Sequence, residues 1–224
     1  MFESKYNKLL TVVLIVVVVA IIGLLGFLAY NYFQESNSTQ EASEFVEGYQ
    51  GDDIVPDSDE DKNEGGDNEN NPLEVNSIGD VNETTTTTRR KQTYKGYTVG
   101  GTMKIPKINF SYPVLEKVTK SSIENSVAIL YGAGLNQVGN TVIIGHNYRN
   151  GQFFSNNKKL TKGDKIYITD YEGNQKTYVI YNKFETTPED TSFYQRDTNG
   201  KAEVTLSTCT DDSKARLIIF AKEE

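Results

Sequence analysis

The distribution of apolar residues divides the chain into three parts, and the first part is one uninterrupted apolar run. Residues Leu9 to Ala29 carry no charge and consist mainly of Val, Leu and Ile. As a helix, this run is long enough to cross the roughly 30 Å hydrocarbon core of a bilayer. The apolar region of a cleaved signal peptide is shorter, about 7–15 residues, and no small-x-small cleavage site follows this run. We therefore predict an uncleaved transmembrane signal anchor over residues 9–30.

Charges beside this run predict its orientation. Lys5 and Lys8 precede it, whereas no Lys or Arg directly follows it. Positive charge tends to remain on the cytoplasmic side of a membrane. We expect residues 1–8 to be cytoplasmic and the chain after the span to be extracellular, in a single-pass protein of the cell membrane.

The second part, residues 31–90, is polar and acidic. Positions 35–83 hold 16 Asp or Glu against one basic residue, Lys62. Low hydrophobicity and like-charge repulsion oppose the burial of a core, so we predict a disordered, low-complexity linker. The run Asp57-Ser-Asp-Glu-Asp61 resembles the start of a calcium loop. However, Lys62 stands where that loop needs Gly, and Asn68 stands where it needs a bidentate Glu. A solvated spacer is the interpretation that we prefer.

The third part, residues 91–224, has short apolar runs separated by turn-forming residues. Such runs, rich in Val, Ile, Thr and Tyr and bounded by Gly, Asn and Asp, are typical of strands. Eight of them predict a mainly β domain, which we expect to be a closed barrel. The predicted strands are Gly101–Ile105, Tyr112–Leu115, Val127–Leu130, Asn140–Gly145, Lys165–Thr169, Lys176–Lys183, Glu203–Thr208 and Arg216–Ala221.

Helix signals are few in this domain. Ser121-Ser-Ile-Glu124 has the spacing of a capping box and predicts a short helix before Val127. One more helical turn is expected near Phe153–Leu160. The barrel should therefore carry one or two short helices.

Net charge differs between the parts. Residues 89–224 contain 20 Lys or Arg and 14 Asp or Glu, so this segment is net +6 although the whole chain is net −8. A basic surface favours anionic wall polymers or a lipid face, and attraction to the acidic linker of the chain itself is an equal alternative. Because no nucleic-acid-binding motif is present, we expect no nucleic-acid partner.

The chain has one cysteine and one histidine, and each ends a predicted strand. His146 follows Thr141-Val-Ile-Ile-Gly145, Cys209 follows Val204-Thr-Leu-Ser-Thr208, and Arg216 opens the last apolar run. A lone Cys is more often a small buried apolar residue than a nucleophile. Outside the cell, however, a single Cys has no intramolecular disulfide partner, so its thiol stays free.

Together these three residues suit acyl transfer. A Cys thiolate attacks an amide carbonyl to give a thioester, and a positioned His protonates the departing amine. A permanently charged Arg holds the charge that develops on the carbonyl oxygen. If the last two strands are antiparallel, Arg216 faces Cys209. The alternative is a strand-edge Arg216 paired with Asp211 or Asp212.

The motifs around these residues resemble those of the sortases, cysteine transpeptidases of Gram-positive bacteria. The resemblance implies an eight-stranded β-barrel with Cys209 as nucleophile, His146 as general acid and then base, and Arg216 as substrate or oxyanion stabiliser. It rests on Ile105-Pro-Lys-Ile108, Tyr131-Gly-Ala-Gly134, Gly139-Asn-Thr-Val-Ile-Ile-Gly-His146 and the Cys209 and Arg216 strands.

The resemblance also implies a reaction and its partners. A secreted protein with an LPXTG-like C-terminal sorting signal is cut after Thr and transferred to an amine of a peptidoglycan precursor or of a pilin, with hydrolysis of the signal as a related activity. We expect no cofactor and no metal, although some sortases use calcium and the resemblance leaves calcium activation open.

Gly-His-Asn followed by Gly151-Gln-Phe-Phe154 is similar to several sortase groups, in class D or B as well as class A. The chain ends at Glu224 without a second span, which favours wall anchoring over pilin polymerisation.

Neighbouring residues have less certain roles. Thr208 either helps to form the oxyanion site or is simply a β-branched strand residue. Asn147 is expected to form a turn rather than to orient the His146 ring. Segment 181–197 is where sortases carry the loop that shapes substrate choice, so we expect specificity there. Aromatic residues are assigned to the core rather than to the site: Tyr148, Phe153, Phe154, Phe184, Phe193 and Tyr194.

Two other functions remain alternatives. An L,D-transpeptidase or a cysteine peptidase outside the cytoplasm needs the same Cys-His pair but does not rely on an Arg on the strand after Cys. A non-catalytic wall-binding β-domain needs neither, and its Cys209 would be buried and inert to thiol reagents.

Overall fold

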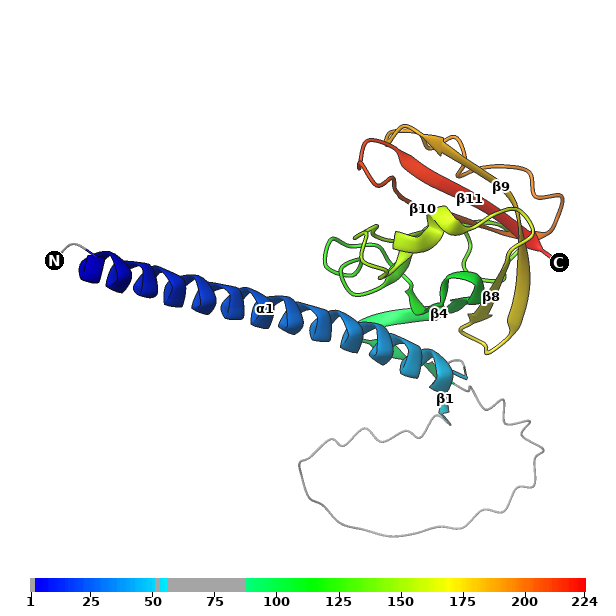
Figure 1. Ribbon diagram of the computed structural model, residues 1–224. Coiled ribbons are helices and arrows are strands. Elements are labelled where there is room, and N and C mark those ends of the chain that lie inside the picture. The colour runs from blue at the N-terminus through cyan, green and yellow to red at the C-terminus, as the bar shows by residue number, and fades with distance from the viewer. Residues whose placement is uncertain (1–2, 51–52, 56–87) are drawn as a thin grey trace, which may run out of the picture.

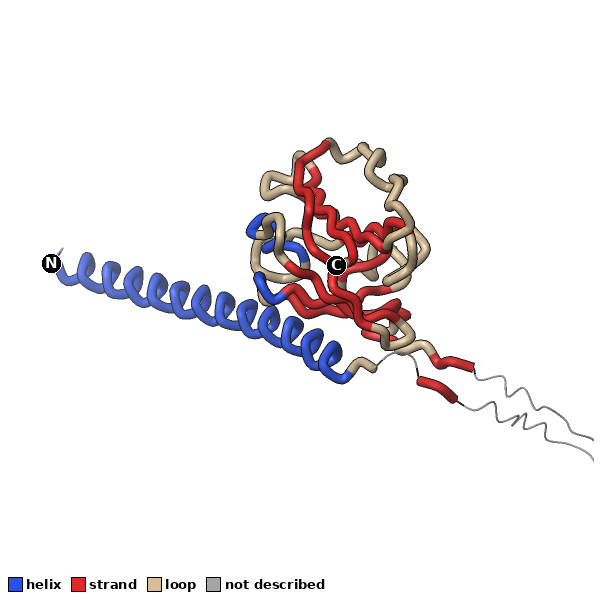
Figure 2. Tube along the Cα trace, turned by 90° about the vertical axis from the view of Figure 1, so that its right-hand side faces the viewer, coloured by secondary structure: helices blue, strands red, loops and turns tan. Residues whose placement is uncertain are grey.

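The computed structural model of the protein describes residues 3–50, 53–55 and 88–224 (Figure 1). These residues form a long helix that leads into a β-barrel (Figure 2). The elements in chain order are α1 (Glu3–Gly48), β1 (Asp53–Val55), β2 (Thr88–Arg90), β3 (Thr93–Tyr94), β4 (Tyr97–Ile105), the 3-10 helix η1 (Pro106–Ile108), β5 (Phe110–Leu115), β6 (Val127–Tyr131), β7 (Gly139–Ile144), the 3-10 helix η2 (Phe154–Lys159), β8 (Lys165–Asp170), β9 (Gln175–Thr186), β10 (Ala202–Cys209) and β11 (Arg216–Glu223).

Eight strands close into the barrel. Their order is β4-β5-β6-β7-β10-β11-β9-β8, and the ring closes because β4 also pairs with β8. The predicted mainly β, eight-stranded fold is therefore confirmed, and each predicted strand corresponds to one member of the ring. The short β3 adds to the edge of β4, and β1 pairs with β2 in a separate two-stranded sheet.

Alternating side chains of the strands fill the barrel, as the two-residue period of a strand requires. In β10, Ala202, Val204 and Leu206 are at most 1% exposed and belong to the main core cluster. The outer wall carries a second, smaller cluster, in which Ile218 of β11 packs with Val142 and Phe193. This second cluster attaches the segment between β9 and β10 to the barrel.

The first residues of the predicted linker differ from our expectation, because α1 continues past residue 30 and packs against the barrel. Ala42, Val46 and Tyr49 are at most 8% exposed, and Phe45 makes an edge-on ring contact with Tyr94 at 5.2 Å. These four residues, three in α1 and Tyr49 directly after it, have the i, i+3, i+4, i+7 spacing of one helix face. Their burial orders a segment that is otherwise acidic. Residues 56–87, with the run that resembles a calcium loop, lie outside the described residues.

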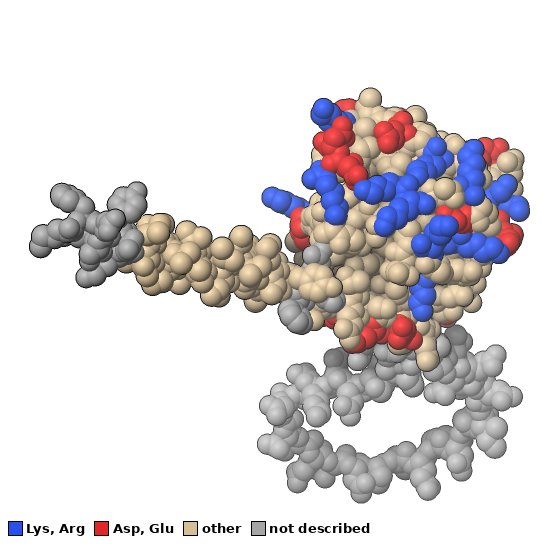
Figure 3. All heavy atoms as spheres, viewed as in Figure 1, with Lys and Arg blue, Asp and Glu red and all other residues tan. Residues whose placement is uncertain are grey.

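The predicted membrane span, residues 9–30, lies in the N-terminal part of α1. Among the described residues, α1 is the one helix long and apolar enough to cross a membrane, with a mean hydropathy of 3.3 over its most apolar window. Its projecting part shows no charged side chain in Figure 3, whereas Lys and Arg spread over the visible face of the barrel. The apolar N-terminal part of α1 and the C-terminal part that packs on the barrel therefore belong to one continuous helix.

The helix predicted from the capping box does not form. Residues 120–125 are turns, in which Ser122 rather than Ser121 bonds the backbone: its hydroxyl accepts from Thr119 N at 2.8 Å and donates to Lys117 O at 3.0 Å. Such local bonds compete with helix formation. Glu124 is therefore free of a capping role. The other expected helical turn is present as η2.

Candidate active site

The register of two parallel strands brings the ends that carry His146 and Cys209 together. β7 and β10 pair in parallel, with Ile144 opposite Ser207, and Gly145 N extends the ladder by donating to Ser207 O. Two residues further along, the chain reaches His146 on one strand and Cys209 on the other. Both residues line the same cavity.

Arg216 completes this arrangement from the other side of β10. β10 and β11 are antiparallel, with Cys209 directly opposite Arg216, and Arg216 Nη1 donates to Cys209 Sγ at 3.1 Å. The two carboxylates that sequence reasoning offered as alternative partners are engaged elsewhere. Asp211 pairs with Lys158, and Asp212 accepts from the Thr210 hydroxyl. Arg216 is thus directed at the sulfur.

The cavity that contains these three side chains has a volume of about 280 Å³. Cys209 is half-buried at its edge, so the thiol is neither sealed in the core nor fully in solvent. One wall of the cavity is apolar. It consists of Ile123, Leu130, Ile144, Pro188, Phe193 and Tyr194.

Part of the predicted specificity segment forms this apolar wall. Asn140 Nδ2 donates to Phe193 O at 3.1 Å and to Tyr194 O at 2.9 Å, which fixes the segment on β7. Burial raises the pKa of Tyr194, and the nearby charge of Arg216 partly offsets this. Phe193 and Tyr194 therefore lie in the candidate site, although sequence reasoning assigned them to the core.

Asn147 connects the loop that follows β7 and carries His146 to the end of β10 and the turn that follows it. Its Nδ2 donates to Cys209 O at 3.0 Å and to Asp211 Oδ1 at 2.9 Å. Its Oδ1 accepts from Arg149 N at 3.1 Å, which makes the local turn that its sequence context predicts. The residue thus both forms a turn and holds two chain segments together.

Thr208 is buried and supports the histidine strand. Its hydroxyl donates to Gly145 O at 2.7 Å. The hydroxyl proton is therefore already used in the free protein, which leaves less reason to assign Thr208 a bond to an oxyanion. Its contact with Gly145 instead fixes the backbone directly before His146.

His146 makes two further contacts that sequence reasoning missed. Its ring stacks on Tyr148, with 4.9 Å between centroids and 21° between planes. Its Nε2 is shielded from solvent and lies 3.3 Å from Glu124 Oε1, within ion-pair distance but without hydrogen-bond geometry. The second oxygen of Glu124 accepts from the Tyr148 hydroxyl. The only signal at Glu124 was its capping-box spacing, which pointed elsewhere.

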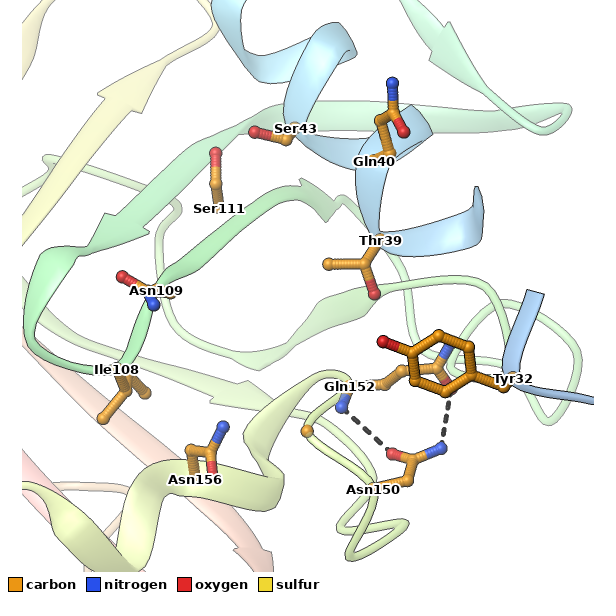
Figure 4. Close-up of a pocket in the computed structure, with 11 residues that line it drawn as sticks. Tyr32, Thr39, Gln40, Ser43, Ile108, Asn109, Ser111, Asn150, Gln152 and Asn156 are labelled. Atoms are coloured by element: carbon orange, nitrogen blue, oxygen red, sulfur yellow. Dashed lines mark hydrogen bonds between the residues drawn. The ribbon is translucent and has the colours of Figure 1, made fainter. Parts of the chain in front are cut away.

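A larger hollow, of about 760 Å³, lies away from these residues, between α1 and the barrel (Figure 4). Its walls bear hydroxyl and amide side chains such as Thr39, Ser43 and Asn156, without a Cys, His or charged group. The candidate chemistry therefore belongs to the smaller cavity. Within the described ranges, no cluster of three or more Cys, His, Asp or Glu is placed to hold a metal ion.

Comparison with known proteins agrees with the fold of the barrel. The family model described as the sortase domain matches residues 103–224, which is more than half of the chain. The protein belongs to the sortase family. This segment of the sortase contains all eight strands of the barrel, apart from the first residues of β4.

Individual relatives give the same result. Sortase A from Bacillus anthracis is 32% identical over 122 residues, which cover 53% of this sortase and 57% of that relative. The match thus spans little more than half of the curated relative. Among solved structures, a Clostridium perfringens Sortase D5 transpeptidase is similar with 31% identity and a TM-score of 0.52, covering 57% of this chain and 79% of that one. A lid mutant of Sortase A from Corynebacterium diphtheriae has 29% identity and a TM-score of 0.52, covering 57% and 71%.

Proposed function

We propose that this sortase is a cysteine transpeptidase acting at the cell wall, with Cys209 as nucleophile, His146 as proton carrier and Arg216 as cationic stabiliser. The observation that carries the proposal is the Arg216 Nη1 to Cys209 Sγ contact of 3.1 Å, inside a cavity that His146 also lines. A guanidinium in this position can stabilise the negative charge that develops on a substrate carbonyl oxygen beside the sulfur.

The first half-reaction forms a thioester. The Cys209 thiolate adds to the carbonyl carbon of the scissile peptide bond, and Arg216 stabilises the negative charge that moves onto the carbonyl oxygen. The carbon–nitrogen bond then breaks, and protonated His146 gives its proton to the departing amine. The acyl group remains on sulfur.

The second half-reaction reverses these roles with a new amine. Neutral His146 takes a proton from the incoming amine, whose nitrogen attacks the thioester carbon. The carbon–sulfur bond breaks, Cys209 leaves as a thiolate, and a new amide is formed. Water in place of the amine gives hydrolysis of the sorting signal.

The apolar wall supports an LPXTG-like sorting signal as the donor substrate. Leu130, Phe193 and Pro188 provide a surface for the apolar Leu and Pro side chains of such a signal. The acceptor in this proposal is an amine of a peptidoglycan precursor, with a pilin amine as the second candidate. A basic barrel surface favours approach to anionic wall polymers (Figure 3).

The apolar half of α1 supports a location at the cell membrane. In this proposal residues 9–30 span the bilayer, residues 1–8 are cytoplasmic, and residues 91–224 form the extracellular catalytic domain. The C-terminal end of α1 then holds the barrel close to the membrane, because Ala42 and, directly after the helix, Tyr49 belong to the core cluster of the barrel.

The proposal is tested with the full chain in detergent micelles, a panel of LPXTG-like peptides and a triglycine acceptor. We expect cleavage after Thr and a triglycine-linked product, both abolished in Cys209→Ala and in His146→Ala. A panel without cleavage, together with a Cys209 thiol that resists reagents until unfolding, would support the non-catalytic wall-binding domain instead.

A further inference from the structure

We propose that Glu124 and Tyr148 are positioning residues that together fix the orientation of the His146 ring during transpeptidation. This inference rests on the proposed function, because it assigns the two residues to the histidine that carries the proton. Neither residue touches the cysteine cavity, whose lining does not include them. They act through His146.

Two independent contacts determine how the ring lies. The Tyr148 ring fixes its plane, since the two rings are stacked at 4.9 Å and 21°. The Glu124 carboxylate fixes its rotation within that plane, since Oε1 lies 3.3 Å from Nε2. With both its plane and its rotation within that plane restrained, the His146 ring can make only small displacements.

Both positioning residues are themselves held. The Tyr148 hydroxyl donates to Glu124, and its ring packs against Phe153 at 5.7 Å. Burial and the bond to Glu124 raise the pKa of Tyr148, so its hydroxyl keeps its proton and stays a donor. Phe153, at 6% exposure, in turn contacts Tyr112 of β5 at 5.3 Å.

The turn that carries Glu124 is fixed to the barrel at both ends. Ser126 donates to Pro113 O of β5, and Ser122 is fully buried with its hydroxyl bonded to Lys117 O. Glu124 is therefore presented from a rigid turn, although its own side chain is 54% exposed. Because an exposed ion pair is weak, we expect Glu124 to orient the His146 ring rather than to contribute much to stability.

The arrangement has a chemical consequence for the histidine. A carboxylate 3.3 Å from Nε2 favours the neutral tautomer that carries its proton on Nε2, because its negative charge attracts an N–H group and repels a nitrogen lone pair. Nδ1 is then the ring nitrogen that is free to exchange a proton with substrate. Glu124 and Tyr148 thereby select one ring nitrogen for catalysis.

The test uses Glu124→Gln, Glu124→Ala, Tyr148→Phe and Tyr148→Ala in the full chain in detergent micelles. We expect kcat to fall by about 10- to 100-fold in the two Ala variants, because misplacement of a catalytic group by about 1 Å has effects of this size. Gln keeps an acceptor and Phe keeps the stack, so these two variants should retain part of kcat. KM should not change, since neither residue lines the cavity.

A spectroscopic signature separates positioning from a general structural effect. The chain contains a single histidine, so selective ¹⁵N labelling reports on His146 alone. At a pH at which the imidazole is neutral, we expect the Nε2-protonated tautomer in the wild type, a mixture of tautomers in Glu124→Ala, and loss of the upfield ring-current shift in Tyr148→Ala but not in Tyr148→Phe.

Tyr171 and Glu172 offer matched controls. They lie together in the turn between β8 and β9, and Tyr171 is 37% exposed, close to the 39% of Tyr148. Tyr171→Ala and Glu172→Gln should leave kcat and the His146 spectrum unchanged. Wild-type kcat together with an unchanged His146 spectrum in both Ala variants would overturn the inference. If the wild type itself is inactive, the proposed function fails, while the spectrum still decides whether Glu124 and Tyr148 hold the ring.

Discussion

Arg216 and Cys209 are cross-strand neighbours, and the guanidinium lies 3.1 Å from the sulfur. The antiparallel pairing of β10 and β11 sets this contact, because directly opposed residues project to the same face of a sheet. The cation is therefore in place before any substrate binds. A preorganised charge of this kind needs no rearrangement when charge develops on the substrate.

Replacing Arg216 should slow acylation strongly. We expect Arg216→Ala to reduce the single-turnover rate of acyl-enzyme formation by about 100- to 1,000-fold, the usual effect of losing one oxyanion-stabilising donor. Arg216→Lys should recover part of the rate, because it restores the charge without the planar fork. Lys214→Ala, an exposed cation in the adjoining turn, is the control. An Arg216→Ala enzyme of near wild-type rate would favour the L,D-transpeptidase or cysteine-peptidase alternative.

Removing the Asn147 side chain should affect both stability and activity. Asn147→Ala loses the bonds to Cys209 O and Asp211, at about 1 kcal/mol each, so the thermal unfolding midpoint should fall by several degrees. The acylation rate should fall as well, because the histidine and cysteine loops lose their connection. Asn150→Ala is the control, because the side chain of Asn150 bonds to Gln152, two residues along the chain (Figure 4). Equal midpoints for the two variants would contradict this role.

The Asp211 carboxylate predicts a pH dependence of stability. The hydrogen bond from Lys158, and to a smaller extent the one from Asn147, lower the pKa of the Asp211 carboxyl in the folded protein below its usual value of about 3.9. A lowered folded pKa stabilises the protein fully above the unfolded pKa, and this contribution is lost as pH falls through the folded pKa. The gap in unfolding midpoint between wild type and Asp211→Asn should therefore be constant above about pH 5 and shrink at lower pH. A gap that does not depend on pH would contradict the assignment.

The strands of the barrel were predictable because their signals are local. Turn residues such as Gly173 separate apolar runs, and each run needs only its own period to be recognised. The docked half of α1 was harder to predict, because Ala42 and Val46 are apolar positions within an acidic stretch. Glu124 was beyond prediction, since its partners His146 and Tyr148 are distant in sequence and only the folded chain brings them together.

The docking of α1 should be sensitive to charge at its buried face. Val46 is 4% exposed, so Val46→Asp places an unpaired charge at a buried position and forfeits burial worth about 1.5–3 kcal/mol. We expect the unfolding midpoint to fall and residues near Tyr49 to become accessible to protease. Glu47→Gln, on the exposed face of the same turn, should change neither. If Val46→Asp behaves like this control, α1 does not contribute to the fold.

The buried side chain of Asn136 should be important for stability, because it connects its loop to the turn before β9 and to β9 itself. Asn136 Nδ2 donates to Asn174 O at 2.8 Å, and its Oδ1 accepts from the Tyr178 hydroxyl at 3.0 Å. Asn136→Ala leaves that buried hydroxyl without its partner, so we expect a loss of about 2–4 kcal/mol. Tyr178→Phe should cost less, and the double variant should show strong coupling between the two positions. Additive effects in denaturant titration would contradict the shared bond.

The central claim, a thioester on Cys209, is tested most directly by the intact mass of the full chain mixed with an LPXTG-like peptide and no amine. The account predicts a single adduct equal to the peptide up to Thr, located on Cys209, removed by hydroxylamine and absent in Cys209→Ala. Peptide cleavage without this adduct in the wild type, or with the same product in Cys209→Ala, would contradict it.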